Sequence, residues 1–397
     1  MTGRANPTRR QFQMNKHGLS AEAQLLGKLM VTSATESEFV ARFVTRGFGA
    51  ESEARRMFQA AVASGLIAPI GANVQPNDYS ETYATWRSQR GMISDHARTT
   101  TFRRGIEALC TPDTVVIDVG SGSGILSLFA ARAGAKQVYA LELTGMIEDA
   151  KQIAADNGYA DTIQFIRGDA SEFQCPEPAT LVLGEWAGMF LIDEHRHYDA
   201  FCSVRDRCLA PGGAVLPGRA SMFLAPIDNS QLSIERGFGF WKNPIHGFDF
   251  SVAARRLAES SRRIIAEVRS STLLGEYQIA SIDCTKGDSR DFFFETEFEH
   301  HFTAPSACQG FAGYFNLELA PGILVDTSPY AKFTHWQQSY FPIEELFLSR
   351  GETLVVRVKT FLDPILSTVM MELKIFIPTR DTGPVQSYTY PINNIYS

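Results

Sequence analysis

One segment restricts the possible folds more than any other: VVIDVGSGSGILSLFAARAGA, at residues 115–135. Its first five residues, 115–119, are apolar enough for a buried strand, and residues 125–133 form an apolar helical segment. Between them lie Gly120, Gly122 and Gly124. Glycines let the backbone approach a ligand closely, and the following helix N-terminus favours negative charge. The segment therefore predicts a nucleotide-type site between a strand and a helix.

The same alternation continues along the chain and predicts an α/β fold. Further strands are expected at residues 137–141, 162–166 and 179–183, in a region where helix-like and strand-like segments alternate. This order is typical of a parallel, doubly wound, Rossmann-like sheet, which we assign to residues 76–215. Residues 216–397 instead show period-2 strands such as TLVVRVKTF and TVMMELKIF, and predict a mostly antiparallel β domain, a barrel or a sandwich.

The first 75 residues differ from both regions and predict a small helical N-terminal module. Three short helices are expected, at residues 21–30, 36–46 and 51–64, followed by the turn-rich linker GANVQPND at 71–78. These helices carry no basic stripe, so a DNA-reading role is not expected. Packing on the α/β domain or on a second subunit is the favoured alternative to an independent interaction module.

Charge and cysteine usage exclude several classes of protein. The net charge of −7 argues against a nucleic-acid partner, which would need a basic face. The six cysteines form no CxxC pair and no zinc-ligand spacing, so neither a metal site nor a disulfide framework is expected. The chain shows no secretory leader and no membrane-spanning apolar stretch. We therefore expect a cytoplasmic protein without a membrane partner.

Carboxylates at the ends of successive strands favour S-adenosylmethionine as the nucleotide ligand. A GxGxG turn alone is a weak signal that dinucleotide sites share. Asp118, at the end of its strand, can orient the loop or the ligand's ammonium. Glu142 ends the next strand, where an acid binds ribose hydroxyls. Asp169 and Ala170 follow the third strand, near the expected adenine, although a solvated turn explains Asp169 about equally well.

Two further glutamates follow the fourth strand. Glu185 and Glu194 stand nine positions apart in GEWAGMFLIDEH, at the edge of the sheet where parallel strands present ligand-binding groups. Either could be an ordinary surface acid. A pair of carboxylates beside a methyl-donor site calls for a further explanation.

With these motifs the chain resembles the protein arginine methyltransferases, from about Tyr79 to the C-terminus, about four-fifths of its length. Glu185 and Glu194 match that family's double-E hairpin, and residues 334–336 its THW loop. Tyr79 and Tyr83 match the tyrosines of its YFxxY helix, and GMISDHAR at 91–98 a segment carrying methionine, aspartate and arginine. The segment FWKNPIHGFDF resembles its dimerisation arm, placed near residues 236–252.

The resemblance implies an S-adenosyl-L-methionine-dependent arginine N-methyltransferase, homodimeric, with a protein or peptide acceptor. Together with the motifs it gives three sets of site residues. The catalytic set is Glu185, Glu194, His335, Asp95 and Met92. The cofactor set is Arg98, Asp118, Gly120, Gly122, Gly124, Glu142, Asp169, Ala170 and Tyr83. The acceptor set is Tyr79 and Trp336.

The implied chemistry suits these residue types. A free guanidinium is protonated and its charge is delocalised, so two carboxylates can draw that charge away from the reacting nitrogen. His335 with Asp95 resembles a His–Asp pair that either relays the proton or braces two domains. Arg98 is expected to contact the donor's carboxylate. His195 and His197 are interpreted as solvated neighbours without a role.

The sequence departs from the family at several positions and leaves the acceptor open. Ser80 replaces a phenylalanine in the YFxxY motif, Ala187 stands where many members have methionine, and Ser171 where a glutamate often occurs. Free L-arginine or a guanidino metabolite is an alternative acceptor, which the N-terminal module, Ser80 and Ala187 favour. A catalytically silent regulatory paralogue is the alternative of another class, which the intact glutamates, glycine loop and THW argue against.

Overall fold

The computed structural model describes residues 36–46, 48–63, 84–259, 261–363 and 368–392. The chain divides into two compact units: Met1–Gln75 with Asp363–Thr368, and Pro76–Leu362 with Val369–Ser397. In the first unit, α2 (Glu36–Thr45) and α3 (Glu51–Ala63) agree with two of the predicted helices. They share a small aromatic core in which the ring of Phe39 lies 5.7 Å from that of Phe43 and 5.6 Å from that of Phe58. The helix predicted at residues 21–30 lies outside the described residues.

The second unit contains the predicted parallel sheet, which has five strands in the order β3-β2-β1-β4-β5. The strands are β1 (Val115–Val119), β2 (Gln137–Glu142), β3 (Ile163–Arg167), β4 (Ala179–Leu183) and β5 (Leu209–Leu216), and every pairing is parallel. The order reverses between β1 and β4. Loops that follow these two strands therefore open onto a common crevice, where ligands bind in sheets of this kind.

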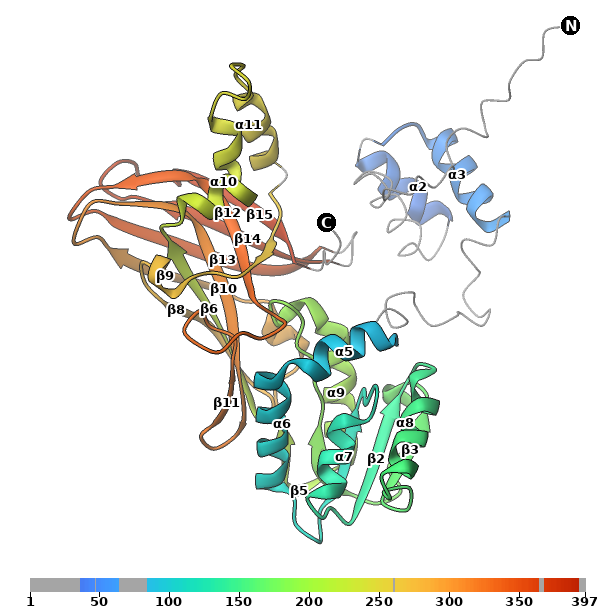
Figure 1. Ribbon diagram of the computed structural model, residues 1–397. Coiled ribbons are helices and arrows are strands. Elements are labelled where there is room, and N and C mark those ends of the chain that lie inside the picture. The colour runs from blue at the N-terminus through green and yellow to red at the C-terminus, as the bar shows by residue number, and fades with distance from the viewer. Residues whose placement is uncertain (1–35, 47, 64–83, 260, 364–367, 393–397) are drawn as a thin grey trace, which may run out of the picture. The chain divides into compact units, whose positions relative to one another are not determined.

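Helices alternate with these strands along the chain. They are α5 (Trp86–Ser94), α6 (His96–Leu109), α7 (Ile125–Arg132), α8 (Met146–Asp156) and α9 (His195–Cys208), with the short helices η2 (Ala170–Glu172) and η3 (Ile192–Glu194). Figure 1 shows α7 and α8 beside the sheet that holds β2 and β3. Asp95 separates α5 from α6, because its side chain caps α6 by accepting from the N–H of Arg98 at 2.9 Å. This break fixes the direction in which α6 leaves the site.

Antiparallel sheets follow, as the period-2 pattern predicts. A six-stranded sheet runs in the order β7-β12-β10-β6-β8, with β11 paired to β10, and a four-stranded sheet runs β15-β14-β13-β9. The strands are β6 (Arg219–Ile227), β7 (Ile264–Ala266), β8 (Tyr277–Asp283), β9 (Glu295–His301), β10 (Ser306–Ala320), β11 (Ile323–Asp326), β12 (Gln338–Leu348), β13 (Thr353–Asp363), β14 (Thr368–Phe376) and β15 (Gln386–Pro391). One hydrophobic core joins the inner face of these sheets to the parallel sheet.

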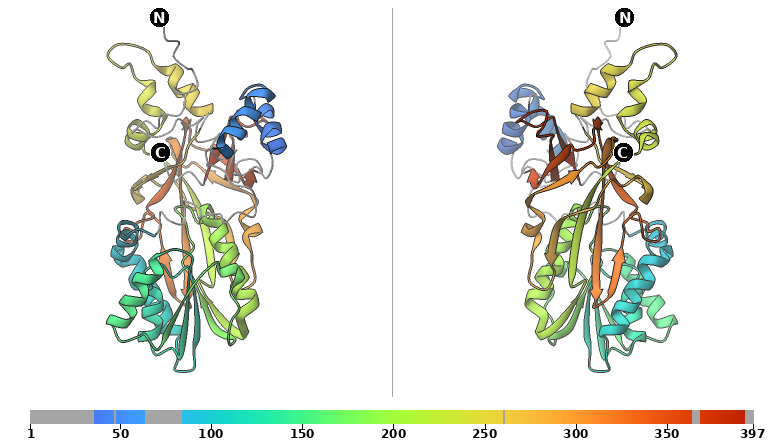
Figure 2. Two further views of the ribbon diagram at one scale, coloured as in Figure 1. Left: turned by 90° about the vertical axis from the view of Figure 1, so that its right-hand side faces the viewer. Right: turned by 90° about the vertical axis from the view of Figure 1, so that its left-hand side faces the viewer.

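A helical insertion leaves the antiparallel sheets between β6 and β7. It comprises α10 (Ser230–Arg236), η4 (Phe238–Lys242) and α11 (Ser251–Glu259), and Figure 2 shows it projecting away from the strands. We call residues 230–259 the arm. Phe240, Phe248 and Phe250 are exposed on it, Phe248 to 69%. The remaining short helices are η5 (Ser270–Thr272) and η6 (Ser289–Phe292).

The domain boundaries at 75/76 and 215/216 stay a prediction, although the chain changes sheet between Leu216 and Arg219. Among the described residues, none of the helices has both the length and the apolar character needed to cross a membrane.

Candidate active site

The glycine loop between β1 and α7 has the backbone conformation that the sequence predicts. Gly120, Gly122 and Gly124 all have positive φ, at 77°, 53° and 82°. The N–H of Gly122 donates to Glu142 Oε2 at 2.8 Å, and the backbone N–H of Thr144 donates to Glu142 Oε1 at 2.8 Å. A side chain on Gly120 would meet no atom within 4 Å, so the loop leaves open space beside this glycine. The loop and Glu142 are thus fixed to each other beside a space for a ligand.

Asp118 lies beneath this loop and is completely buried. Its Oδ2 accepts from the hydroxyl of Ser127 at 2.6 Å, and burial raises the pKa of its carboxyl to about 7. Its Oδ1 and the buried hydroxyls of Ser121 and Ser123 have no hydrogen-bond partner among the described residues. Buried polar atoms are normally paired. These groups therefore fit a polar ligand seated on the glycine loop.

A hollow lies at the end of β3, where the sequence predicts the adenine contact. It has a volume of about 170 Å³, and its lining includes Leu141, Ile166, Gly168, Asp169 and Ala170. Asp169 is exposed and caps η2 by accepting from the N–H of Ser171 at 2.8 Å. The apolar part of the lining suits a flat ring, and the carboxylate of Asp169 lies at its edge.

Glu185 and Glu194 lie at the two ends of a tight loop, residues 185–194, which we call the acceptor hairpin. Gly188 and Leu191 form an antiparallel bridge, and Leu191 has the positive φ of 57° that side-chain-bearing residues rarely adopt. A Cβ on Gly188 would lie 2.3 Å from Asp193 Oδ1, so only glycine fits at this position. The hairpin therefore has a strained and specified backbone, a common feature of functional sites.

Glu185 is held by Arg98, which comes from α6. Arg98 Nη2 lies 2.8 Å from Glu185 Oε2, and both side chains are largely buried. The other oxygen, Glu185 Oε1, accepts from the N–H of Ala187 at 2.9 Å, and Arg98 Nη1 lies 3.4 Å from the carbonyl of Met92. The expected contact of Arg98 with the donor's carboxylate stays a prediction. In the structure, Arg98 orients the carboxylate of Glu185.

Glu194 is buried at the start of α9 and contacts a histidine of the next turn. His197 Nδ1 lies 3.0 Å from Glu194 Oε2, while the side chain of Glu194 is 6% and that of His197 45% exposed. The sequence predicts His197 as a solvated neighbour without a role, whereas the structure places it against Glu194. Its Glu-x-x-His spacing was a signal for a contact, because residues three apart share one helix face.

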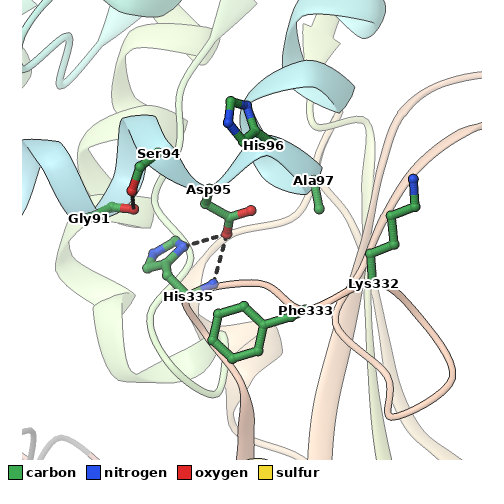
Figure 3. A pocket seen from close by; sticks show the side chains of 8 residues that line it. All are labelled: Gly91, Ser94, Asp95, His96, Ala97, Lys332, Phe333 and His335. Atoms are coloured by element: carbon green, nitrogen blue, oxygen red, sulfur yellow. Dashed lines mark hydrogen bonds and ion pairs between the residues drawn. The ribbon is translucent and has the colours of Figure 1, made fainter.

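Asp95 and His335 form the pair that the sequence predicts, drawn in Figure 3. Asp95 Oδ2 accepts from the backbone N–H of His335 at 2.8 Å and lies 2.9 Å from His335 Nδ1. Burial acts to raise the pKa of Asp95, but the hydrogen bonds from His335 and Arg98 hold it below its ordinary value. A pocket of about 410 Å³ opens over this pair, with Lys332 and Phe333 on one wall and His96 on the other.

Two buried contacts fix the acceptor hairpin to the antiparallel sheets. The indole N–H of Trp336 donates to the carbonyl of Ala187 at 2.9 Å, and Trp336 is buried. Arg263 Nη1, just before β7, lies 3.0 Å from Asp193 Oδ2, and both side chains are buried. Sequence reasoning missed the Arg263–Asp193 pair because the two residues lie 70 positions apart. A contact of Trp336 with an acceptor stays a prediction.

The remaining predicted residues can be placed only in part. Met92 is half-buried near the end of α5, and its carbonyl also accepts from the hydroxyl of Thr99 at 3.1 Å. Tyr79 and Tyr83 lie outside the described residues. The described site therefore brings together the glycine loop, three strand-end acids and the acceptor hairpin around the crevice of the parallel sheet.

Two family models match consecutive parts of the chain. A methyltransferase domain matches residues 116–213, the region of the parallel sheet. An arginine methyltransferase oligomerization subdomain matches residues 218–363, a region that contains the arm.

Curated proteins and solved structures agree with these models. Protein arginine N-methyltransferase 1 of Chlamydomonas reinhardtii is 31% identical over 309 residues, 76% of this chain and 88% of the relative. Its namesake in Schizosaccharomyces pombe is 33% identical over 288 residues, 69% of this chain and 82% of the relative. The Trypanosoma brucei PRMT1 enzyme–prozyme heterotetrameric complex with AdoHcy contains a similar chain, with a TM-score of 0.71 and 27% identity over 78% of this chain and 99% of that one. Arabidopsis thaliana protein arginine methyltransferase 10, at 24% identity and a TM-score of 0.67, covers 79% of this chain and 99% of its own and shares the fold.

Proposed function

The chain belongs to the protein arginine N-methyltransferase family, and we propose that it methylates a guanidinium nitrogen of arginine in a protein or peptide. It is an enzyme that uses S-adenosylmethionine. The observation that carries the choice of a guanidinium is the pair of largely buried carboxylates, Glu185 and Glu194, on one strained hairpin after β4.

We assign the binding of the methyl donor to the groups around the glycine loop. Glu142, fixed by the N–H of Gly122, is in the position to accept from ribose hydroxyls. Asp118 Oδ1 and the hydroxyls of Ser121 and Ser123 supply buried polar groups beneath the loop. Asp169 and Ala170 line the hollow proposed for the adenine. When bound, S-adenosylmethionine supplies a methyl group on a positively charged sulfur.

The two acceptor glutamates hold and polarise the guanidinium. Carboxylates bind this planar cation through paired, charge-assisted hydrogen bonds, which orient one nitrogen. Their negative charge draws the delocalised positive charge away from the nitrogen that attacks. Arg98 and the N–H of Ala187 keep Glu185 in one orientation, so the acceptor binds to a preformed group. Met92 and the two tyrosines, 79 and 83, are proposed to pack around the reacting centre.

A substitution of Glu185 tests this function. Glu185→Gln keeps the size of the side chain but removes its charge, and we expect methyl transfer to fall at least about a hundredfold, the effect of losing one electrostatic stabiliser. Mass spectrometry of a glycine- and arginine-rich peptide incubated with S-adenosylmethionine measures it. Retained transfer by Glu185→Gln would contradict the proposal. A silent regulatory paralogue would show no transfer even with the native chain.

Free L-arginine is the second candidate acceptor, because it presents the same guanidinium to the hairpin. The pocket of about 410 Å³ over Asp95 and His335 carries Lys332 on its wall, and that ammonium would favour an acceptor with a carboxylate nearby. Parallel incubations with free L-arginine and with the peptide separate the two. Methyl transfer to free arginine alone would replace the protein substrate by a metabolite.

We also propose a homodimer and a cytoplasmic location. The arm exposes Phe240, Phe248 and Phe250, and this region lies within the match to the oligomerization subdomain. All six cysteines are free thiols, in keeping with a reducing compartment. Fractionation of the source cells, with the protein detected by antibody, tests the location.

A further inference from the structure

His197 forms a link between the acceptor hairpin and solvent. Its Nδ1 lies 3.0 Å from Glu194 Oε2, and the imidazole is 45% exposed while Glu194 is buried. Glu194 precedes α9 directly and His197 lies in the first turn of that helix. A proton on Glu194 therefore has a titratable group within hydrogen-bond distance that itself reaches water.

Methylation of a guanidinium releases one proton, so this link has a use. A bond forms between the guanidinium nitrogen and the methyl carbon while the carbon–sulfur bond breaks, and its electron pair stays on sulfur. The nitrogen then carries one proton too many, because the acceptor entered with a positive charge and leaves with the same charge. The excess proton must pass to a base and then to solvent.

We propose that this proton leaves the active site through Glu194 to His197 and from there to water. The inference rests on the proposed function, since it assigns the exit of a proton that only guanidinium methylation releases. Glu194 is the group in contact with the acceptor, and His197 acts through it. The neutral imidazole takes the proton at Nδ1 and returns it to solvent before the next turnover.

The His335–Asp95 pair is already engaged in holding the fold. Asp95 accepts three N–H contacts, from the backbone of Arg98 and from the backbone and Nδ1 of His335. Asp95 also caps α6. Its carboxylate therefore connects the start of that helix to the loop after β11, which contains His335. Its low pKa makes it a poor proton acceptor. We therefore assign Asp95 and His335 to bracing the site and the exit of the proton to His197, and the pH profiles of the two histidine variants separate these roles.

The charges that face His197 suit a base that gains and then loses one proton in every turnover. Partial burial acts to lower the pKa of His197, but the bond to Glu194 and the charges of Glu194, Glu185 and Glu142 raise it above the ordinary value. These acids come from η3, the loop after β4 and the end of β2. Arg98 neutralises part of the charge on Glu185, and His195 and Arg196 lie on the same turn as His197. A bound guanidinium and sulfonium add positive charge, which favours the neutral, proton-accepting imidazole.

The first test needs no turnover. NMR of ring-labelled histidines, with His197→Gln to assign the resonance, follows the titration of His197 in the native chain and in Glu194→Gln. We expect the midpoint of His197 to fall in Glu194→Gln, and to fall in the native chain when the arginine-rich peptide is added with S-adenosylhomocysteine. A midpoint that neither change moves would overturn the link.

The second test follows turnover of the same peptide from pH 5.5 to 9. In His197→Gln we expect kcat to fall about a hundredfold, the lower end of the usual contribution of a positioned general base, with little change in KM. The fall of kcat towards acidic pH should also disappear from its profile. Imidazole added to His197→Ala should restore turnover, which a purely structural role would not allow. His335→Gln should lose activity but keep the acidic limb.

A matched control is available on the antiparallel sheets. His301 lies 3.9 Å from Glu299 on β9, a second His–Glu contact in which both side chains are exposed, and His301→Gln should behave as the native chain does. If His197→Gln keeps the native kcat and pH profile, or if the acidic limb disappears in His335→Gln instead, the proposal is wrong. If the native chain methylates neither the peptide nor free arginine, the proposed function fails first, and the NMR titration alone decides the link.

Discussion

Asp95 connects three parts of the site through single atoms. Its Oδ1 accepts from the N–H of Arg98, and its Oδ2 receives both N–H contacts of His335, 240 positions away in the sequence. Arg98 in turn holds Glu185. One carboxylate therefore sets the start of α6, the position of His335 and, through Arg98, the orientation of an acceptor glutamate.

Asp95 should make the stability of the chain depend on pH in one direction. Because its pKa in the folded chain lies below the ordinary value, its contribution is present above about pH 4 and is lost as the pH falls further. At pH 7 we expect Asp95→Asn to lower the free energy of unfolding by about 1.5–3 kcal/mol, the usual contribution of a hydrogen bond to a charged group. The deficit should shrink below pH 4.

Calorimetric melting from about pH 2 to pH 8 covers the range in which the contribution is lost and measures this dependence. Asp161→Asn, at an exposed aspartate between α8 and β3, is the control and should melt as the native chain does at every pH. A deficit for Asp95→Asn that stays constant across the whole range would show that the charge of Asp95 does not contribute.

Among the elements, the acceptor hairpin depends most on its surroundings. The backbone strain at Leu191 and the close approach of Asp193 to Gly188 are sustained by contacts from outside the hairpin. Trp336 binds the carbonyl of Ala187, and Arg263 pairs with Asp193, the residue before Glu194. The antiparallel sheets thus position an acceptor glutamate that belongs to the parallel sheet.

The contribution of the buried Arg263–Asp193 pair to the free energy of unfolding can be measured by comparing a single and a double variant. Arg263→Met leaves the carboxylate of Asp193 buried without its cation, and we expect a loss of about 3–5 kcal/mol in the free energy of unfolding. Arg263→Met combined with Asp193→Asn should lose less, because the uncompensated charge is gone. Urea unfolding measures both.

An exposed ion pair provides the comparison for this element. Lys151 and Glu148 on α8 lie 3.2 Å apart with both side chains exposed, and Lys151→Met should cost at most about 1 kcal/mol. If the double variant is less stable than Arg263→Met alone, then Asp193 stabilises the hairpin by its hydrogen bond to Phe190 rather than by the ion pair.

At the scale of the whole molecule, the arm should determine the oligomeric state. Phe248 is 69% exposed at the turn between η4 and α11, and a phenylalanine so exposed is suited to an interface. We expect Phe248→Asp to shift the chain from dimer to monomer, weakening association at least about a hundredfold, as for loss of a central interface residue. Light scattering coupled to size exclusion measures the mass.

The matched control lies on the antiparallel sheets. Phe347 on β12 is 67% exposed outside the arm, and Phe347→Asp should keep the native mass. A native chain that is monomeric at micromolar concentration would refute the dimer, and dissociation by Phe347→Asp would move the interface away from the arm.

The sequence by itself determined the elements whose patterns are local. The strand predicted at residues 115–119 is β1 and that at 179–183 is β4, and the other predicted strands differ from β2 and β3 by one residue at most at each end. Whether an apolar run between glycine turns forms a strand depends mainly on residues close by in the sequence, which explains this agreement. β5, with the sequence LAPGGAVL, was missed because its proline and glycines are typical of a turn. Its pairing with β4 comes from the sheet.

The candidate site likewise has residues that the sequence predicts and contacts that only the tertiary structure shows. The glycine loop, the strand-end acids and the two hairpin glutamates could be predicted, because their spacing along the chain carries the signal. Their partners could not: Arg98 holds Glu185 from 87 positions away, and Arg263 holds Asp193 from 70. Even His197, three residues from Glu194, faces it only because α9 begins at the hairpin's end. The sequence specified which groups can react; the tertiary structure decided which charges meet, since contact and burial depend on packing between distant segments.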